Sequence, residues 1–192
     1  AGHGGHFYSI KGAEGVYKTS EKLAEFFGCD NPERIAYTQN ATHALNAGIR
    51  GYVKRDEHVV TTAMEHNSVL RTLEEWCQYT VVDAESDGTV RPEKIKKAIT
   101  PKTRLVVVNH ASNVCGTVQD IEKIGKIAKG KGVAFMVDGA QSAGAIPIDV
   151  KKMGIDMLAV SGHKGLMSPL GVGVLYVAEG IELEPLITGG TG

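Results

Sequence analysis

The sequence predicts an α/β domain of three layers, α/β/α, built around a mainly parallel mixed sheet. Short apolar runs bounded by Gly, Pro or charged residues, such as 104–109 and 133–137, are typical of buried strands. Segments with a helical spacing of apolar residues, such as 120–130, separate these runs and favour parallel pairing through crossovers. The last run, 172–177, follows the run 157–160 too closely for a crossover helix, so we expect that pair to be antiparallel.

The expected elements alternate along the chain. Residues 1–12 show no clear period and are expected to form a loop or the remnant of an N-terminal arm. After them an apolar stripe predicts a helix that ends near Gly28. Pro92 in a first turn and Asp120 as an N-cap mark two later helices. The stripe of the first helix consists of Val16, Leu23, Phe26 and Phe27. Strands are expected at 34–38, 58–62, 79–83, 104–109, 133–137, 157–160 and 172–177, and helices at 13–28, from the turn 39–46 to 53, 68–78, 92–99 and 120–130.

The composition limits the classes of function. A chain of 192 residues predicts one domain, and a formal net charge of −1 gives no indication of nucleic-acid or anionic-membrane binding. No apolar stretch approaches the roughly 20 residues of a membrane span. The 3 cysteines are odd in number and widely spaced, which favours a reducing compartment, and we expect a cytoplasmic protein. His3 and His6 are interpreted as solvated loop residues, and no metal site is expected.

Polar side chains follow two of the predicted strands, where open α/β sheets bind ligands. Their types suit one chemistry. The amine of Lys164 can form a Schiff base with an aldehyde, and a carboxylate such as Asp138 can hold a pyridine nitrogen protonated. Gln141 can donate to a phenolic oxygen, and Ser161 and His163 can donate to a phosphate. These are the requirements of pyridoxal 5'-phosphate (PLP), which we therefore expect as the cofactor.

The segments VDGAQSAG, residues 137–144, and SGHKGLMSPLGVGVLYV, residues 161–177, resemble the class V (fold-type I) aminotransferases, and within them the cysteine desulfurase-like branch. The resemblance runs from about residue 12 to residue 192. It implies that residues 1–192 form the PLP-binding large domain of a PLP transferase, as a fragment without the N-terminal arm and the C-terminal small domain. It also implies a homodimer in the full-length form and a fragment that is inactive alone.

The resemblance assigns further residues to the cofactor site. It places the phosphate at the helix that begins near Thr42 and His43, in a Thr-x-x-x-Asn pattern completed by Asn46. His66 would stack on the PLP ring and transfer protons as a second catalytic residue beside Lys164, and Asn113 would lie beside cofactor and substrate. From the residues alone, the structural interpretations are favoured, with Thr42 as an N-cap, His66 as a loop residue and Asn113 as a turn residue.

The function implied by the resemblance is cysteine desulfuration, which gives alanine and enzyme-bound sulfur, with cysteine as substrate and a sulfur-acceptor protein as partner. The nucleophilic Cys and the carboxylate-binding Arg of the family lie downstream of this chain, so Cys115 is not expected to be that nucleophile. Residues 165–170 depart from the Tyr-Gly-Pro type of well-studied desulfurases. A class V aminotransferase and a selenocysteine/cysteine lyase therefore stay open as alternatives. A non-catalytic PLP-fold interaction domain is a third alternative, independent of this loop.

Overall fold

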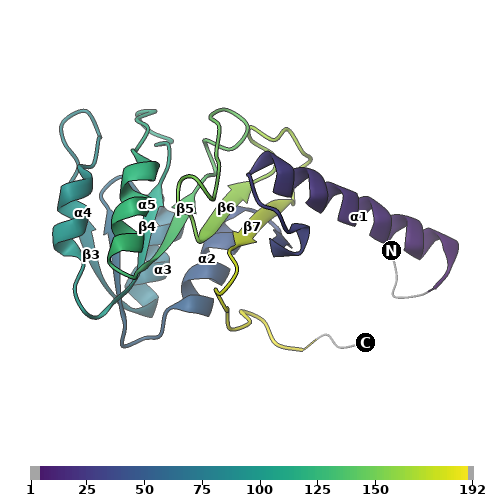
Figure 1. Ribbon diagram of the computed structural model, residues 1–192, viewed down its shortest axis with the longest axis horizontal. Helices are drawn as coiled ribbons and strands as arrows, with labels where there is room; N and C mark the ends of the chain where they lie inside the picture. Colours follow the sequence, from purple (N-terminus) through teal and green to yellow (C-terminus); the bar gives the residue numbers. More distant parts are fainter. Residues whose placement is uncertain (1–4, 190–192) are drawn as a thin grey trace.

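The computed structural model describes residues 5–189, which form a seven-stranded sheet covered by helices on both faces (Figure 1). The expected strands and the last four helices are all present, with bounds within a few residues of the prediction. The helices are α1 Phe7–Phe26, the short 3-10 helix η1 Pro32–Arg34, α2 Ala41–Tyr52, α3 Asn67–Trp76, α4 Pro92–Ala98 and α5 Ile121–Gly130. The strands are β1 Ile35–Thr38, β2 His58–Thr62, β3 Gln78–Val82, β4 Thr103–Asn109, β5 Ala134–Asp138, β6 Met157–Ser161 and β7 Gly173–Val177.

The sheet is mixed and mainly parallel, as predicted. Its strand order is β1-β7-β6-β5-β4-β2-β3. The pairs among β2, β3, β4, β5 and β6 are parallel, whereas β7 runs antiparallel to both of its neighbours. The antiparallel pairing expected for the last strand is therefore confirmed. Because the parallel strands all end at one edge, the polar residues that follow them gather at that edge.

Alternate residues of the central strands feed two hydrophobic cores. In β4, Val106 and Val108 face a core shared with α4 and α5, while Leu105 and Val107 face a core shared with α2 and α3. Figure 1 shows α4 and α5 in front of the sheet, with α2 and α3 behind it. Each fully buried Val or Leu contributes roughly 1.5–3 kcal/mol relative to an exposed one. This double burial explains why the central strands are continuous apolar runs.

The prediction for the N-terminus was wrong. Residues 7–12 are helical, so α1 begins at Phe7 and not at residue 13, with His6 at its N-cap and hydrogen-bonded to Ser9 at 3.0 Å. Phe7 and Tyr8 are 68% and 77% exposed, and Figure 1 shows α1 extending away from the sheet. A helix that buries little carries no amphipathic period, which is why its start was missed. His3 lies outside the described residues.

The apolar stripe assigned to α1 was also wrong in part. Val16 and Phe26 are 55% and 54% exposed, whereas Phe27, just beyond the helix, is fully buried. Leu23 does pack against the core, as the stripe predicted, and the buried residues of α1 are Ser9, Ser20 and Ala24. Ser20 Oγ also lies 3.0 Å from the hydroxyl of Tyr37 in β1, so a hydrogen bond helps to attach this helix beside its hydrophobic packing.

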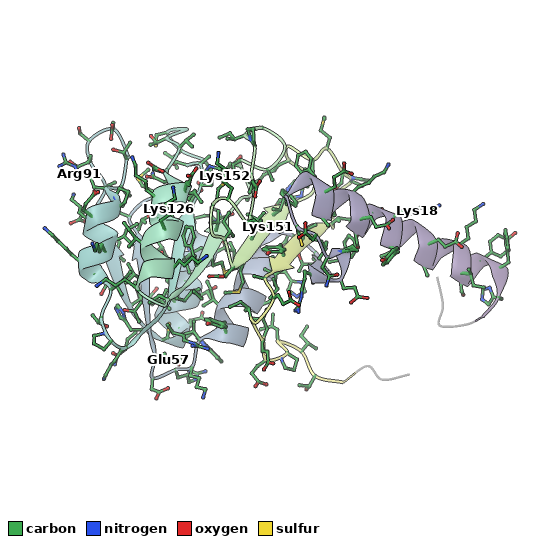
Figure 2. All side chains as sticks on the ribbon, in the orientation of Figure 1. Lys18, Glu57, Arg91, Lys126, Lys151 and Lys152 are labelled. Carbon is green, nitrogen blue, oxygen red and sulfur yellow. The ribbon has the colours of Figure 1, made fainter. Side chains whose placement is uncertain are left out.

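Charged side chains cover the outer surfaces of the helices. Figure 2 shows Lys126 on α5 and Arg91 at the start of α4 pointing away from the sheet. Lys126 forms an ion pair with Glu122 at 2.7 Å, one turn earlier, and Arg91 forms one with Glu85 at 3.1 Å. Within residues 5–189, no helix combines the length and apolar character that crossing a membrane requires.

Candidate functional site

A cavity of about 90 Å³ lies at the carboxyl edge of the sheet, between the ends of β2, β4, β5 and β6 and the beginning of α2. Seven of the nine residues expected at the cofactor site line it, and His43 and His163 do not. Four lining residues were not anticipated from the sequence. The cavity is lined by Ala41, Thr42, His66, Ser68, Asn109, Asn113, Asp138, Ala140, Gln141, Ser161 and Lys164.

Asp138, the last residue of β5, is the buried acid of the cavity. Its side chain is 4% exposed, and Oδ1 accepts a hydrogen bond from the backbone N–H of Ala140 at 2.9 Å. Burial raises the pKa of Asp138, while this N–H and the charges of Lys164 and His66 act in the opposite direction. Within the described chain no cation forms an ion pair with it. The buried carboxyl therefore has no positively charged partner among the described residues, although such a partner is what stabilises an ionised buried acid.

The beginning of α2 supplies hydrogen-bond donors to the same cavity. Asn40 is the N-cap: its Oδ1 accepts the backbone N–H of His43 at 2.9 Å. The alternative that Thr42 is the N-cap is therefore wrong, and Thr42 instead lines the cavity. The N–H of Ala41 donates to Ser161 Oγ at 3.2 Å, which ties the helix to the end of β6. The partial positive charge of a helix N-terminus suits an anion such as a phosphate.

His43 and Asn46, the other residues of this turn, do not line the cavity. Nδ1 of His43 lies 3.4 Å from the backbone N–H of Gln39, which folds the ring back on its own turn. Asn46 Nδ2 donates to the carbonyl oxygen of Thr42 at 3.0 Å, so the Thr-x-x-x-Asn pattern describes a bond within α2. The structure thus brings Thr42 into the cavity, but leaves His43 and Asn46 beside it.

His66 lines the cavity from the start of α3, where it is also the N-cap. Its Nδ1 accepts the backbone N–H of Ser68 at 3.1 Å and lies 2.8 Å from Ser68 Oγ. Because Nδ1 accepts this hydrogen bond, it carries no hydrogen in the neutral ring, and the proton resides on Nε2. The side chain of His66 therefore both caps α3 and lines the cavity. Ser68 was missed as a lining residue, since it was expected only as the first residue of the helix 68–78.

Lys164 follows β6 in the connection to β7, and His163 precedes it on an exposed turn outside the cavity lining. The N–H of Gly162 donates to the carbonyl oxygen of Val172 at 2.9 Å, which closes this connection. Gly165 lies so close to Gly144 that a Cβ on either residue would overlap the backbone of the other segment. The absence of side chains at these two positions lets the Lys164 segment pack against the segment that follows Asp138.

Asn113 reaches the cavity from a tight turn after β4. Ser112 Oγ accepts the N–H groups of Val114 at 3.2 Å and Cys115 at 3.4 Å, and Gly116 has a φ of +74°. Asn113 therefore lies in a turn, as the residues alone indicated, and it also lines the cavity. Asn109, the last residue of β4, was missed: its Oδ1 accepts the N–H of Ala111 at 3.0 Å. The signal for it was present, since Asn109 is the polar end of an apolar run.

Fold and cavity together define an α/β domain with a ligand site at the carboxyl edge of its sheet, formed around a buried acid and a lysine. The chain belongs to the class V aminotransferase family, whose profile matches residues 2–192.

The chain is similar to several proteins named as cysteine desulfurases. The chain is 38% identical over 198 residues to a probable cysteine desulfurase of Methanothermobacter thermautotrophicus, covering 98% of this chain and 49% of that protein. It is 38% identical over 195 residues to the cysteine desulfurase IscS of Vibrio vulnificus, covering 96% and 48%. The chain thus spans about half the length of the curated relatives it matches.

The chain is also similar to solved structures over nearly its whole length. The apo structure of a cysteine desulfurase from Thermococcus onnurineus NA1 superposes with a TM-score of 0.89 at 36% identity, over 97% of this chain and 49% of that one. The structure of SspA in complex with cysteine superposes with a TM-score of 0.92 at 34% identity, over 98% and 56%. The expected three-layer α/β/α fold of the large domain of this family is therefore confirmed.

Proposed function

We propose that residues 1–192 form the PLP-binding large domain of a cysteine desulfurase, which converts cysteine to alanine and leaves the sulfur bound to the enzyme. The observation that carries this proposal is one cavity that joins a buried carboxyl, a lysine amine and a helix N-terminus. The names of the relatives support the choice of reaction, and the solved complex of SspA with cysteine supports the choice of substrate.

The donors and acceptors of the cavity fit PLP. Asp138 would accept the N–H of the pyridine ring, which supplies the partner that this buried carboxyl lacks. Gln141 would donate to the phenolic oxygen, and Thr42 and Ser161 would hold the phosphate at the beginning of α2. His43 and His163 do not line the cavity, so they would reach the phosphate only after a change of side-chain conformation. Lys164 would hold the aldehyde carbon. Bound PLP supplies an electron sink for bonds broken at the α-carbon of an amino acid.

Three side chains would then handle the protons of the reaction. Lys164, once released by the substrate amine, would take the proton from the α-carbon and return it later. Asp138 would stay ionised against the ring N–H and so keep the ring positively charged. His66 would lie against the ring, and its Nε2–H is available for proton transfer because Nδ1 is occupied by Ser68.

The proposal extends to partners and location. Asn113 would contact the substrate beside the cofactor, and the full-length enzyme would be a homodimer that passes sulfur to an acceptor protein. Cys29, Cys77 and Cys115 are all free thiols. Free thiols are typical of a reducing compartment, and we place the enzyme in the cytoplasm.

The experiment is the turnover of cysteine by the full-length protein supplied with PLP and a reductant, with alanine and sulfide both measured. Asp138→Asn is expected to slow alanine formation by about 10²-fold or more, because an amide cannot keep the ring nitrogen protonated. Asp56→Asn is the matched control, since Asp56 is exposed in the turn before β2; its rate should equal that of the wild type.

Each alternative function gives a different result. Transfer of the amino group to a 2-oxo acid would identify an aminotransferase. Alanine formed faster from selenocysteine than from cysteine would identify a selenocysteine/cysteine lyase. Bound PLP without turnover of either amino acid would identify a non-catalytic domain. An Asp138→Asn enzyme as fast as the wild type would contradict the role of Asp138.

A further inference from the structure

Glu65 is a buried carboxyl beside the cavity for which the proposed mechanism has no use. It lies in the turn between β2 and α3, one residue before His66, and is 9% exposed. Its Oε1 accepts two hydrogen bonds, from the hydroxyl of Thr62 at 2.6 Å and from the backbone N–H of Asn109 at 2.9 Å. Its Oε2 is buried and has no hydrogen-bond partner within residues 5–189.

These bonds connect the two sides of the site. Thr62 ends β2 and Asn109 ends β4, so Glu65 holds the two strand ends together. Asn109 in turn donates through Nδ2 to the carbonyl oxygen of Met64 at 3.2 Å. Asn109 is also the register partner of Asp138 in the β4–β5 pair. The His66 turn and the strand end next to Asp138 are therefore fixed to each other through Glu65.

The surroundings of Glu65 do not suit a negative charge. The charged group that faces it from the neighbouring strands is Asp138, which carries the same sign, and no cation forms an ion pair with Glu65 in the described chain. Burial raises the pKa of Glu65 to about 8, against the opposing effect of the Thr62 and Asn109 hydrogen bonds. A carboxylate here would leave Oε2 charged and without a donor, which is costly.

We propose that Glu65 is a positioning residue that acts as an uncharged carboxylic acid, holding the His66 turn against β4 and leaving the negative charge of the cavity to Asp138. The inference deepens the proposed function and rests on it, since it assumes that Asp138 meets the cofactor ring. If Glu65 were ionised, two carboxylates would compete for the single positive charge of that ring.

The test compares two substitutions in the full-length protein. Glu65→Gln keeps an oxygen acceptor for Thr62 and Asn109 and cannot ionise, whereas Glu65→Ala removes the acceptor. We expect Glu65→Gln to bind PLP within about threefold of the wild type, and Glu65→Ala to bind it about tenfold more weakly or worse, because both donors lose their partner. Equal losses in both variants, or no loss in Glu65→Ala, would overturn the proposal.

Infrared spectroscopy tests the charge state without PLP. The wild type at about pH 6.5 should show a carboxylic-acid C=O stretch that Glu65→Gln lacks, and this band should disappear as the pH is raised through about 8. Glu74→Gln, at an exposed position of α3, should keep the band. Identical wild-type and Glu65→Gln spectra would mean an ionised Glu65. A wild type that binds no PLP but shows the band would defeat the proposed function and leave the charge state of Glu65 established.

Discussion

Replacing Glu65 by Gln should change how the stability of the protein depends on pH. The pKa of Glu65 is about 8 in the folded state, raised by burial from the ordinary 4.5. Because the folded-state pKa is raised, the protonated Glu65 carboxyl contributes to the stability of the folded state. This contribution is fully present below pH 4.5 and is lost as the pH rises through 8. Within that window the unfolded chain gains about 1.4 kcal/mol per pH unit by ionising this carboxyl.

The expected effect is large enough to measure. Between about pH 5.5 and 7.5 the Glu65 carboxyl should lower the free energy of unfolding of the wild type by about 2.7 kcal/mol. Glu65→Gln cannot ionise and lacks this loss, so its stability relative to the wild type should rise by that amount over the same range. Other titrating groups, Asp138 among them, are common to both proteins and cancel in the difference.

The assay is urea denaturation of the full-length protein followed by far-UV circular dichroism at several pH values. Glu74→Gln is the control for the loss of one carboxylate from the exposed face of α3 and should follow the wild type. A stability difference between Glu65→Gln and the wild type that does not vary with pH would refute the reasoning, because it would mean that Glu65 is ionised in the folded protein.

Two further predictions concern the thiols and the helix packing. Hydrogen bonds with Ser112 and Thr117 lower the pKa of the exposed Cys115 thiol to about 7. Burial raises the pKa of the Cys77 thiol to about 11. Iodoacetamide at about pH 7.5 should therefore modify Cys115 well before Cys77, as peptide mass spectrometry would show, and the reverse order would be incompatible with these environments. Gly125→Ala should lower the stability by about 1–3 kcal/mol, since its Cβ would overlap a backbone carbonyl oxygen. Gly130→Ala, with open space around it, should not, and equal urea midpoints for both variants would contradict the packing.

The alternation of strands and helices was predictable because the central strands are buried on both faces. In β4 and β5 almost every residue packs against one of the two cores, which gives apolar runs that cannot be mistaken for surface. Asp138 and Lys164 were predictable for a related reason. Asp138 ends one apolar run and Lys164 lies three residues beyond the end of β6, so both lie near the edge of the sheet that the parallel strands share.

The missed features depend on contacts between distant parts of the chain or on exposed surface. Glu65 is bonded to Asn109, which is 44 residues away, so nothing in its local sequence shows that it is buried and paired. The start of α1 was missed because Phe7 and Tyr8 remain exposed and give no pattern. The N-cap of α2 was missed by two residues, although Asn is a better cap than Thr and stands at position 40.

The most direct measurement locates PLP on the chain. The full-length protein is incubated with PLP, reduced with borohydride, digested and analysed by mass spectrometry. We predict a pyridoxyl group on Lys164, lost in Lys164→Ala and kept in Lys126→Ala, whose side chain lies on the outer surface of α5 (Figure 2). A stoichiometric label on another lysine, or a label that survives in Lys164→Ala, would contradict the assignment of this cavity as the PLP site.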